Sequence, residues 1–579
     1  MASGTADPTP ARAAPAATSQ RWILGSWQDL VFFVATPVFV VPLVALVGRR
    51  FSLDEISAFV VAFGATGHHL PGMIRAYGDR ALFARFRTRF IAAPIFFLAV
   101  CLLLHLNHLD SMTVILTFWG LWHGAAQIYG FERIYDTKAE IKSDLGARLD
   151  LALTVSWFWL AVVYSPGRMT GILREFYRAG GPLVSAGAYE GFVGFWTALT
   201  GLISAAFAAH FVVGWLRGDR RSGIKLALIV SSIAFWWYAM VGINNVVLGV
   251  ALFEIFHDIQ YLAIVWFYNR KRVEQTADLS ASVRFLFRPK VVLIFVYVGL
   301  VLAYGYFAIA PKYVDRGILR DVLLSGVAAS ALLHFYYDGF IWKVRDLETR
   351  KGLGLSSAGA ATESRDLLGW ARHGAKFALF VVPLAVLATS QLGGHGANVA
   401  PYQNFVSIFP EHAPAHFNLA VYTEKAGQPM AAIAHFERAI ELVPDYAEAR
   451  TNLGAVLQEL GNDELALTHY RAALESNPDL GKAQNNLAWL LAASAREDLR
   501  DPGQAVVWAE RAIEVSGRRE PERLDTLAVA YAANARFGDA IRIAEEAIRR
   551  ANRRGKKRLV AEVEARLRGF RSGTPYVDH

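Results

Sequence analysis

One apolar stretch of the sequence contains polar residues of the types that bind metals. The segment from about Ile243 to Tyr268 is long enough to cross a membrane, yet residues 253–261 read Phe-Glu-Ile-Phe-His-Asp-Ile-Gln-Tyr. An ionisable side chain within a membrane costs roughly 2.5–3.5 kcal/mol on insertion, so such residues are candidates for function. Glu254 and His257 share one helix face, and this three-residue spacing is one by which helical bundles hold metal pairs. The stretch therefore predicts a metal site.

Further histidines occupy similar positions in other apolar segments. At 1.5 Å per helical residue, they lie roughly 10–18 Å from the predicted cytoplasmic ends of these segments. These residues are His68, His69, His123, His210 and His334. Histidines distributed at random would not favour one side of the membrane, so we expect them to form one layer with His257.

Polar companions follow several of these histidines at helical spacing. Neutral imidazoles and carboxylates are ligands of iron, manganese and zinc, and tyrosine or glutamine can support them. The predicted ligands are His68, His69, His123, Glu254, His257, His334 and Asp338, and the predicted supporting residues are Arg75, Gln127 and Tyr261. We expect iron, as one or two ions, and leave zinc and copper open. The alternative for each histidine is an ordinary hydrogen bond between helices.

Composition divides the chain into an apolar part and a polar, helical part. Of the 579 residues 54% are hydrophobic, and the mean hydropathy of +0.29 is too high for an ordinary soluble protein. About eleven apolar segments lie within residues 23–392, which predicts an all-α, polytopic bundle of membrane-spanning helices. The single cysteine, Cys101, excludes an intramolecular disulfide and a cysteine-ligated cluster. The charge of +9 collects in loops, so we expect lipid contact and no nucleic-acid partner.

Basic residues predict how this bundle is oriented. Clusters of Lys and Arg follow the even-numbered segments, which places those loops and the N-terminus in the cytoplasm. With an odd number of spans, the C-terminal part lies outside the cytoplasm. We therefore expect a multi-pass protein of a bacterial inner membrane with its polar part in the periplasm.

The polar part contains an internal repeat. Asn418, Asn452 and Asn486 recur every 34 residues, and so do Pro444 and Pro478. A period of 34 residues is that of the tetratricopeptide (TPR) family, with one helix–turn–helix per repeat, and residues 411–552 resemble four such repeats. The resemblance implies an α-solenoid whose concave face binds a protein or peptide partner. The predicted division is a disordered tail (1–22), membrane domain (23–392), linker (393–410), repeats (411–552) and basic tail (553–579).

The histidine-rich membrane part is loosely similar to the membrane di-iron oxygenases of the fatty-acid desaturase and hydroxylase group. The histidine boxes of that group, His-x-x-x-His and His-x-x-His-His, do not occur in residues 23–392. The resemblance implies only the general idea of a multi-histidine site that lipid can reach. The predicted function is therefore a metal-dependent enzyme that oxidises or otherwise modifies a lipid or another hydrophobic substrate.

Two other functions are compatible with the domain order. A multi-span protein that ends in exported tetratricopeptide repeats resembles membrane glycosyltransferases that use lipid-linked sugars. Those enzymes use acids in the first extracytoplasmic loop, where Asp54 and Glu55 stand in this sequence. The third possibility is a non-enzymatic anchor or transport scaffold whose repeats recruit partners.

Overall fold

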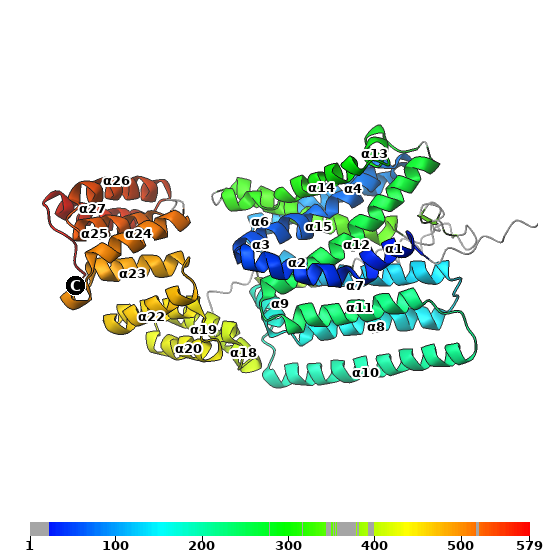
Figure 1. The fold of residues 1–579 in the computed structure, drawn as a ribbon, viewed down its shortest axis with the longest axis horizontal. Coiled ribbons are helices and arrows are strands. Elements are labelled where there is room, and N and C mark those ends of the chain that lie inside the picture. Colours follow the sequence, from blue (N-terminus) through cyan, green and yellow to red (C-terminus); the bar gives the residue numbers. More distant parts are fainter. Residues whose placement is uncertain are drawn as a thin grey trace, which may run out of the picture. The chain divides into compact units, whose positions relative to one another are not determined.

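The chain folds into helices that form two compact units. The computed structural model describes residues 22–109, 111–276, 278–314, 317–342, 349–350, 353, 355, 378, 381–391, 399–516 and 520–578. Regular structure in these residues is entirely helical, which confirms the all-α prediction (Figure 1). One unit comprises residues 1–183 and 187–396 and is called the apolar unit; the other comprises 184–186 and 397–579 and is called the repeat unit. Of the predicted disordered tail, residues 1–21 lie outside the described residues.

The apolar unit is a bundle of helices, several of them broken. Its described elements are α1 (Ser26–Asp29), η1 (Leu30–Val34), α2 (Thr36–Arg50), α3 (Leu53–Val60), η2 (Val61–Gly67), α4 (His69–Gly78), α5 (Arg80–Arg85), α6 (Arg87–Leu106), α7 (Ser111–Lys138), α8 (Asp144–Val163), α9 (Pro166–Arg178), α10 (Ala186–Leu216), α11 (Gly223–Trp237), η3 (Tyr238–Gly242), α12 (Val246–Gln275), α13 (Ala281–Leu286), α14 (Val291–Tyr306), η4 (Ala310–Tyr313) and α15 (Ile318–Ile341). Polar caps begin several of them; the side chain of Asn245, for example, accepts a hydrogen bond from the Leu248 amide at the start of α12.

The prediction of about eleven membrane spans is wrong for the described residues. Six helices are long and apolar enough to cross a membrane, or seven if the bent pair formed by α1–η1 and α2 counts as one. Counting apolar segments in the sequence gives too many membrane spans, because this count takes no account of where a helix breaks or which polar side chains it contains. One of the apolar segments counted from the sequence, residues 52–70, is divided among α3, η2 and the start of α4, and α14 has only 16 residues. With six spans the repeat unit would lie on the same side of the membrane as the N-terminus, and with seven it would lie on the other side. The periplasmic location of the repeat unit therefore stays a prediction.

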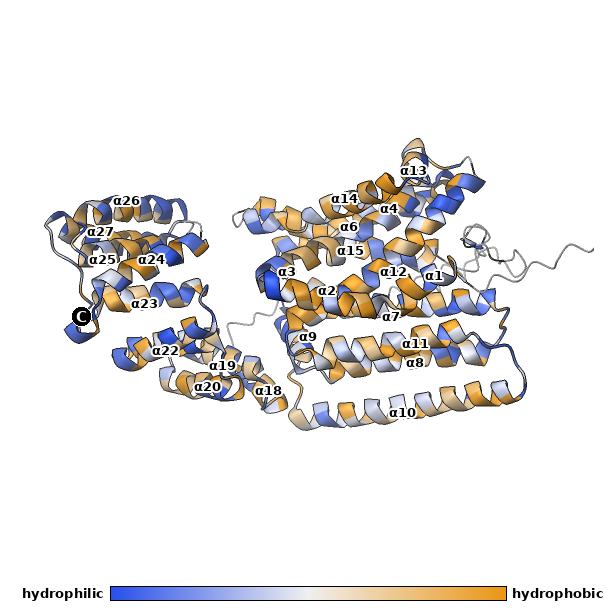
Figure 2. Cartoon of the chain, viewed as in Figure 1, coloured by the Kyte–Doolittle hydropathy of each residue, from blue (hydrophilic) through white to orange (hydrophobic). Residues whose placement is uncertain are grey.

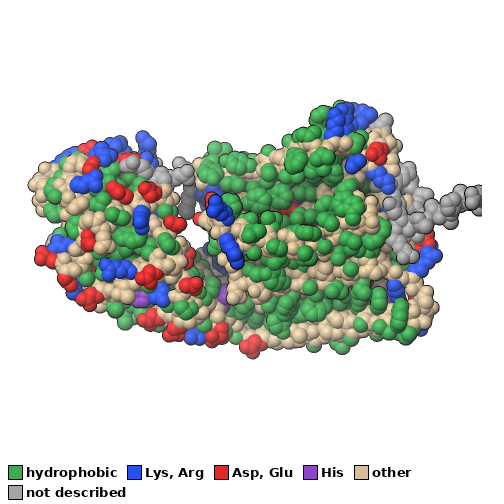
Figure 3. Space-filling view, viewed as in Figure 1, with side chains coloured by type: hydrophobic (Ala, Val, Ile, Leu, Met, Phe, Trp, Pro, Cys, Tyr) green, Lys and Arg blue, Asp and Glu red, His purple; other side chains and the backbone are tan. Residues whose placement is uncertain are grey.

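The outer surface of the apolar unit carries large hydrophobic side chains. Leu202 and Trp215 of α10 are about 70% exposed, and Phe295 of α14 is 72% exposed. Figure 2 shows hydrophobic positions along most helices of this bundle, and Figure 3 shows hydrophobic side chains over much of its visible face. Apolar patches of this extent are unfavourable in water and favourable against lipid or another protein. Several helices could therefore span a membrane.

Three π-helical turns occur among the described elements: η1, η2 and η3. A π-turn shifts the backbone hydrogen-bond pattern by one residue, so nearby carbonyls become available to side chains. The carbonyl–donor pairs are Phe33 with Gln260 Nε2 (3.1 Å), Gly64 with His68 Nδ1, Ala239 with Arg168 Nη2 (3.2 Å) and Met240 with Arg168 Nη1 (3.0 Å). The π-turns thus supply fixed acceptors inside the bundle.

The backbones of α14 and η2 are in direct contact. A Cβ added to Gly67 would lie 2.6 Å from the carbonyl oxygen of Ala62 and 2.8 Å from that of Val301. A Cβ added to Gly305 would overlap the Ala62 carbonyl. Only glycine fits at these two positions, because the obstructing atoms belong to the backbone and cannot rotate away. This crossing fixes η2, the segment that leads into His68.

The repeat unit consists of successive helix pairs. Its described elements are α18 (Ala400–Ile408), α19 (Ala413–Lys425), α20 (Pro429–Leu442), α21 (Ala447–Glu459), α22 (Asp463–Ser476), α23 (Gly481–Ala493), η5 (Glu497–Leu499), α24 (Pro502–Ser516), α25 (Pro521–Ala533), α26 (Phe537–Arg553) and α27 (Lys557–Arg571). Gly427 and Gly461 follow α19 and α21 with φ values of 75° and 78°, a left-handed conformation that ends a helix. They explain why glycine recurs with the 34-residue period.

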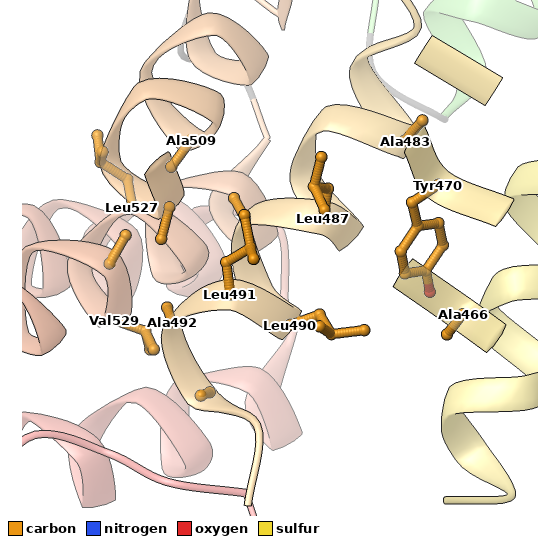
Figure 4. Packing of buried hydrophobic residues seen from close by; sticks show 14 of the residues in the cluster. Ala466, Tyr470, Ala483, Leu487, Leu490, Leu491, Ala492, Ala509, Leu527 and Val529 are labelled. Carbon is orange, nitrogen blue, oxygen red and sulfur yellow. The ribbon is translucent and has the colours of Figure 1, made fainter. Parts of the chain in front are cut away.

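Small side chains let the helices of the repeat unit pack closely. Figure 4 shows Leu487, Leu491 and Ala492 of α23 between residues of α22 on one side and residues of α24 and α25 on the other. Leu487 and Leu491 are about 1% exposed. The predicted basic tail also contributes to this core, because α27 buries Val563, Leu567 and Phe570.

Candidate metal centre

Five histidine side chains meet in the interior of the apolar unit. Helices α4, α7, α12 and α15 and the end of η2 position them, and neighbouring rings lie 4.6–5.3 Å apart between centroids. These residues are His68, His69, His123, His257 and His334. All but His123 are at most 4% exposed, and the His123 side chain is 13% exposed. Five histidines of the predicted layer are therefore neighbours in space.

His123, His334 and Asp338 form a set with the geometry of a metal site. The Nε2 atoms of the two histidines are 3.1 Å apart, and Asp338 Oδ2 lies 3.9 Å from His123 Nε2 and 3.7 Å from His334 Nε2. His334 and Asp338 are one helical turn apart on α15, while α7 supplies His123. Two histidines and one carboxylate on one side of an ion are typical of non-haem iron sites, which keep positions open for reactants.

The 3.1 Å distance between the two Nε2 atoms restricts what lies between them. Two nitrogen lone pairs that face each other at this distance repel, so a shared proton or a cation must separate them. Metal–nitrogen bonds of about 2.0–2.1 Å place two ligand atoms of one ion roughly 3.0–3.4 Å apart. The observed distance fits that range, and Nδ1 of His334 has no hydrogen-bond partner among the described residues.

A second set consists of His68, His123 and His257. One ligand atom from each of these residues lies within 4.8 Å of the others. His68 Nδ1 donates to the Gly64 carbonyl, which leaves Nε2 with a lone pair, and Nε2 has no hydrogen-bond partner in the described structure. Because a neutral imidazole offers one lone pair, His123 can serve only one of the two sets at a time.

Asp258 belongs to this centre, although it is not among the ligands predicted from the sequence. It is fully buried, and its Oδ1 lies 3.2 Å from His68 Nδ1. Neither carboxylate oxygen has a hydrogen-bond partner among the described residues, so Asp258 acts on His68 through its charge. A carboxylate beside the non-ligating nitrogen of a histidine strengthens the lone pair of the other nitrogen. The feature of the sequence that points to Asp258 is its position one residue after His257 in the same apolar stretch.

We expect Asp258→Asn to weaken metal binding by about 10–100-fold, the usual effect of removing a carboxylate that orients a ligating histidine. Competition with a chelator would measure the affinity. Glu254→Gln is the comparison, because it neutralises the other acid on the same face of α12. A larger loss with Glu254→Gln than with Asp258→Asn would contradict this assignment.

The other two predicted ligands lie at the edge of the centre. His69 stacks on His334, and its Nδ1 is 2.9 Å from Ser330 Oγ. Glu254 packs against Gly64, where an added Cβ would lie 2.7 Å from Glu254 Cβ. Neither residue belongs to the two sets described above.

Two of the three predicted supporting residues contact the centre. The Tyr261 hydroxyl donates to Asp338 Oδ1 at 3.1 Å, and Gln127 Nε2 donates to the His257 carbonyl at 3.1 Å. Arg75 instead donates to Tyr268 and Thr349 at 3.0 and 3.1 Å and lies 3.8 Å over the Trp342 ring. Its guanidinium therefore supports a neighbouring aromatic cluster.

His210 and the alternative acidic pair lie apart from this cluster. His210 lines a separate small cavity together with Asp150 and Lys225. Glu55 bonds to Ser52 in a capping box at the start of α3, and Asp54 lies in the same first turn. The positions of Asp54 and Glu55 are thus accounted for by their role at the N-terminus of α3, where acidic side chains are favourable.

Comparisons with known proteins concern the repeat unit. Residues 411–479 match the family model described as tetratricopeptide repeat. Similar solved structures include YrrB, a TPR protein with an unusual peptide-binding site (18% identity, 35% of this chain and 100% of that chain, TM-score 0.24). Others are TTC0263 of Thermus thermophilus (17%, 34% and 95%, 0.25) and pilF of Pseudomonas aeruginosa (18%, 36% and 89%, 0.23). No curated protein matches the chain. The family match over residues 411–479 and the successive helix pairs confirm the prediction of tetratricopeptide repeats in this part of the chain.

Proposed function

We propose that the chain is a multi-pass membrane protein whose apolar unit is a metal-dependent oxidoreductase of the non-haem iron type. The observation that carries the proposal is the convergence of His123, His334 and Asp338 on one buried point, with ligand atoms 3.1–3.9 Å apart. Such a set suits an iron ion with open coordination positions. An iron ion bound there would supply oxygen activation.

The residues around the set have separate roles in this proposal. Tyr261 holds Asp338 through a 3.1 Å hydrogen bond, so that the second carboxylate oxygen faces the two histidines. The Gly64 carbonyl accepts the Nδ1 proton of His68, which aims the Nε2 lone pair into the centre, and the Asp258 carboxylate lies 3.2 Å from the same nitrogen. The buried histidines exclude bulk water from the site.

The surroundings of the centre favour a hydrophobic substrate. The site lies inside a bundle whose outer helices expose Leu202, Trp215 and Phe295, so a lipid or another apolar molecule would reach it more readily than a polar one. In this proposal the bundle lies in a bacterial inner membrane with its N-terminus in the cytoplasm. The repeat unit then lies in the periplasm and binds a protein or peptide partner.

Metal analysis of detergent-purified protein tests the proposal. We expect about one iron per chain, as a single two-histidine, one-carboxylate site requires. His123→Ala should remove most of this metal, because His123 belongs to both ligand sets. His210→Ala is the matched control, since His210 occurs at similar depth but lies in a different cavity.

Two results would contradict the proposal. The first is less than about 0.3 metal per wild-type chain after expression in iron-supplemented medium, against the one ion that the ligand set requires. The second is a metal content that His123→Ala leaves unchanged. Zinc in place of iron, with the same dependence on His123, would keep the centre and replace oxidation with hydrolysis.

A further inference from the structure

The segment that follows α27 lies on the repeat unit without helical structure. Thr574–Asp578 has no helical structure, and Tyr576, Val577 and Asp578 are partly buried. The Tyr576 ring packs against the hydrophobic core of the unit. A non-helical segment that partly buries side chains on a helical repeat surface is arranged as a bound peptide would be.

The contacts of this segment are specific for two side chains. The Tyr576 ring lies 5.8 Å from the Trp489 ring, and the Arg566 guanidinium lies 5.3 Å from the centroid of the Trp489 ring and 5.2 Å from that of the Tyr576 ring. Trp489 Nε1 donates to Asp578 Oδ2 at 2.9 Å. The surface therefore recognises an aromatic side chain and, two residues later, a carboxylate.

The backbone of the segment also completes the surface. The Asp578 amide donates to the carbonyl of Ala493, the last residue of α23, at 2.7 Å. Carbonyls at a helix end have no partner within the helix, so an extended chain can bind there. Asp525 of α25 fixes Arg566 through two hydrogen bonds of 2.6 and 3.1 Å, which keeps the guanidinium beside the rings. The neighbouring helices α23, α25 and α27 thus form one preassembled site.

We propose that this surface is the peptide-binding site of the repeat unit and that residues 574–578 are its resident ligand. A protein partner displaces them with a segment that carries an aromatic residue followed, two positions later, by an acid. Such a partner gains a further contact at Lys482, which lies two helical turns before Trp489 on the same face of α23, roughly 10 Å away. Lys482 now donates to Asn452 at 2.6 Å. A partner segment must therefore bind this surface more tightly than residues 574–578 do in order to displace them, and an acidic, aromatic segment has the chemistry to do so.

A peptide-binding experiment tests this proposal. The probe is a fluorescein-labelled peptide with the sequence of residues 573–579, Gly-Thr-Pro-Tyr-Val-Asp-His, and its binding to the full chain is measured in detergent. A tethered segment has an effective concentration in the millimolar range, so the resident segment should compete strongly with free peptide. We expect the double variant Tyr576→Ala/Asp578→Ala to bind the peptide about 10-fold more tightly than the wild-type chain does. Thr574→Ala is the control, because Thr574 is exposed. It should bind the peptide as the wild type does.

The location of the site is tested in the double variant. Adding Trp489→Phe should weaken peptide binding, because the indole N–H that binds the carboxylate is lost while most of the ring remains. Trp508→Phe is the matched control, since Trp508 lies on α24 beside Arg511. Equal binding by the wild type and the double variant, or no binding by the double variant at millimolar peptide, would overturn the proposal. A peptide with Tyr→Ala and Asp→Asn that binds as well as the original would also overturn it.

Discussion

Gly305→Ala is expected to destabilise the apolar unit by about 3 kcal/mol, the upper end of the range for overpacked sites, and to lower its metal content. The added methyl group would overlap the Ala62 carbonyl, so α14 and η2 would have to separate. Because η2 leads directly into His68, their separation would also move a predicted ligand. Thermal unfolding in detergent and metal analysis of the surviving protein measure the two effects.

Gly299→Ala is the matched control for this substitution. Gly299 lies on the same helix, and an added Cβ there would meet no atom within 4 Å. Its midpoint of thermal unfolding should therefore equal or slightly exceed that of the wild type, since alanine favours a helix by about 1 kcal/mol over glycine. Equal midpoints for Gly305→Ala and Gly299→Ala would show that the contact between α14 and η2 is not tight.

Asp338→Ala is expected to reduce metal affinity by more than about 100-fold, because direct ligands matter at least as much as the outer carboxylates that cost roughly 10–100-fold. The substitution also removes the acceptor of the Tyr261 hydroxyl. Activity on a hydrophobic substrate should disappear with the metal. Metal titration and product analysis of the same preparation measure both losses.

Asp54→Ala separates the oxidoreductase from a glycosyltransferase. Asp54 lies in the first turn of α3, and we expect its replacement to change neither the metal content nor the activity. If sugar transfer from a lipid-linked donor is lost with Asp54→Ala and retained with Asp338→Ala, the oxidoreductase proposal is wrong. Loss with Asp338→Ala alone supports the centre described here.

The periodic features of the sequence predicted the structure well. The 34-residue spacing of Asn418, Asn452 and Asn486 identified the repeats, because each helix pair must place equivalent residues at equivalent contacts. The shared depth of the histidines predicted which residues would be close, since helices that cross the same layer bring residues of equal depth together. His210 shows the limit of that reasoning, because it has a similar depth but lies on α10, a helix with few buried residues.

Side-chain direction was harder to predict. Glu254 and Asp258 are one turn apart on the same helix, and the sequence does not tell which of them faces His68. The answer depends on where η2 lies, and η2 is placed by its contact with α14. Arg75 was expected near the ligands because it follows His68 and His69 closely. Seven residues along a helix amount to roughly 10 Å, which is far enough to reach Tyr268 and Trp342 instead.

The π-turn η2 gives the centre a backbone acceptor that an ordinary helix would not offer. A π-turn holds one residue more than an α-helical turn, so it is equivalent to a single-residue insertion that leaves the flanking helix on the same face. Deleting one residue from 61–67 would let the segment close into α-helical turns and would keep the faces of His68 and His69. The Gly64 carbonyl, which accepts the hydrogen bond from His68 Nδ1, would then be taken up by the backbone of the helix. The extra residue of this segment therefore serves the centre by freeing the carbonyl that orients His68.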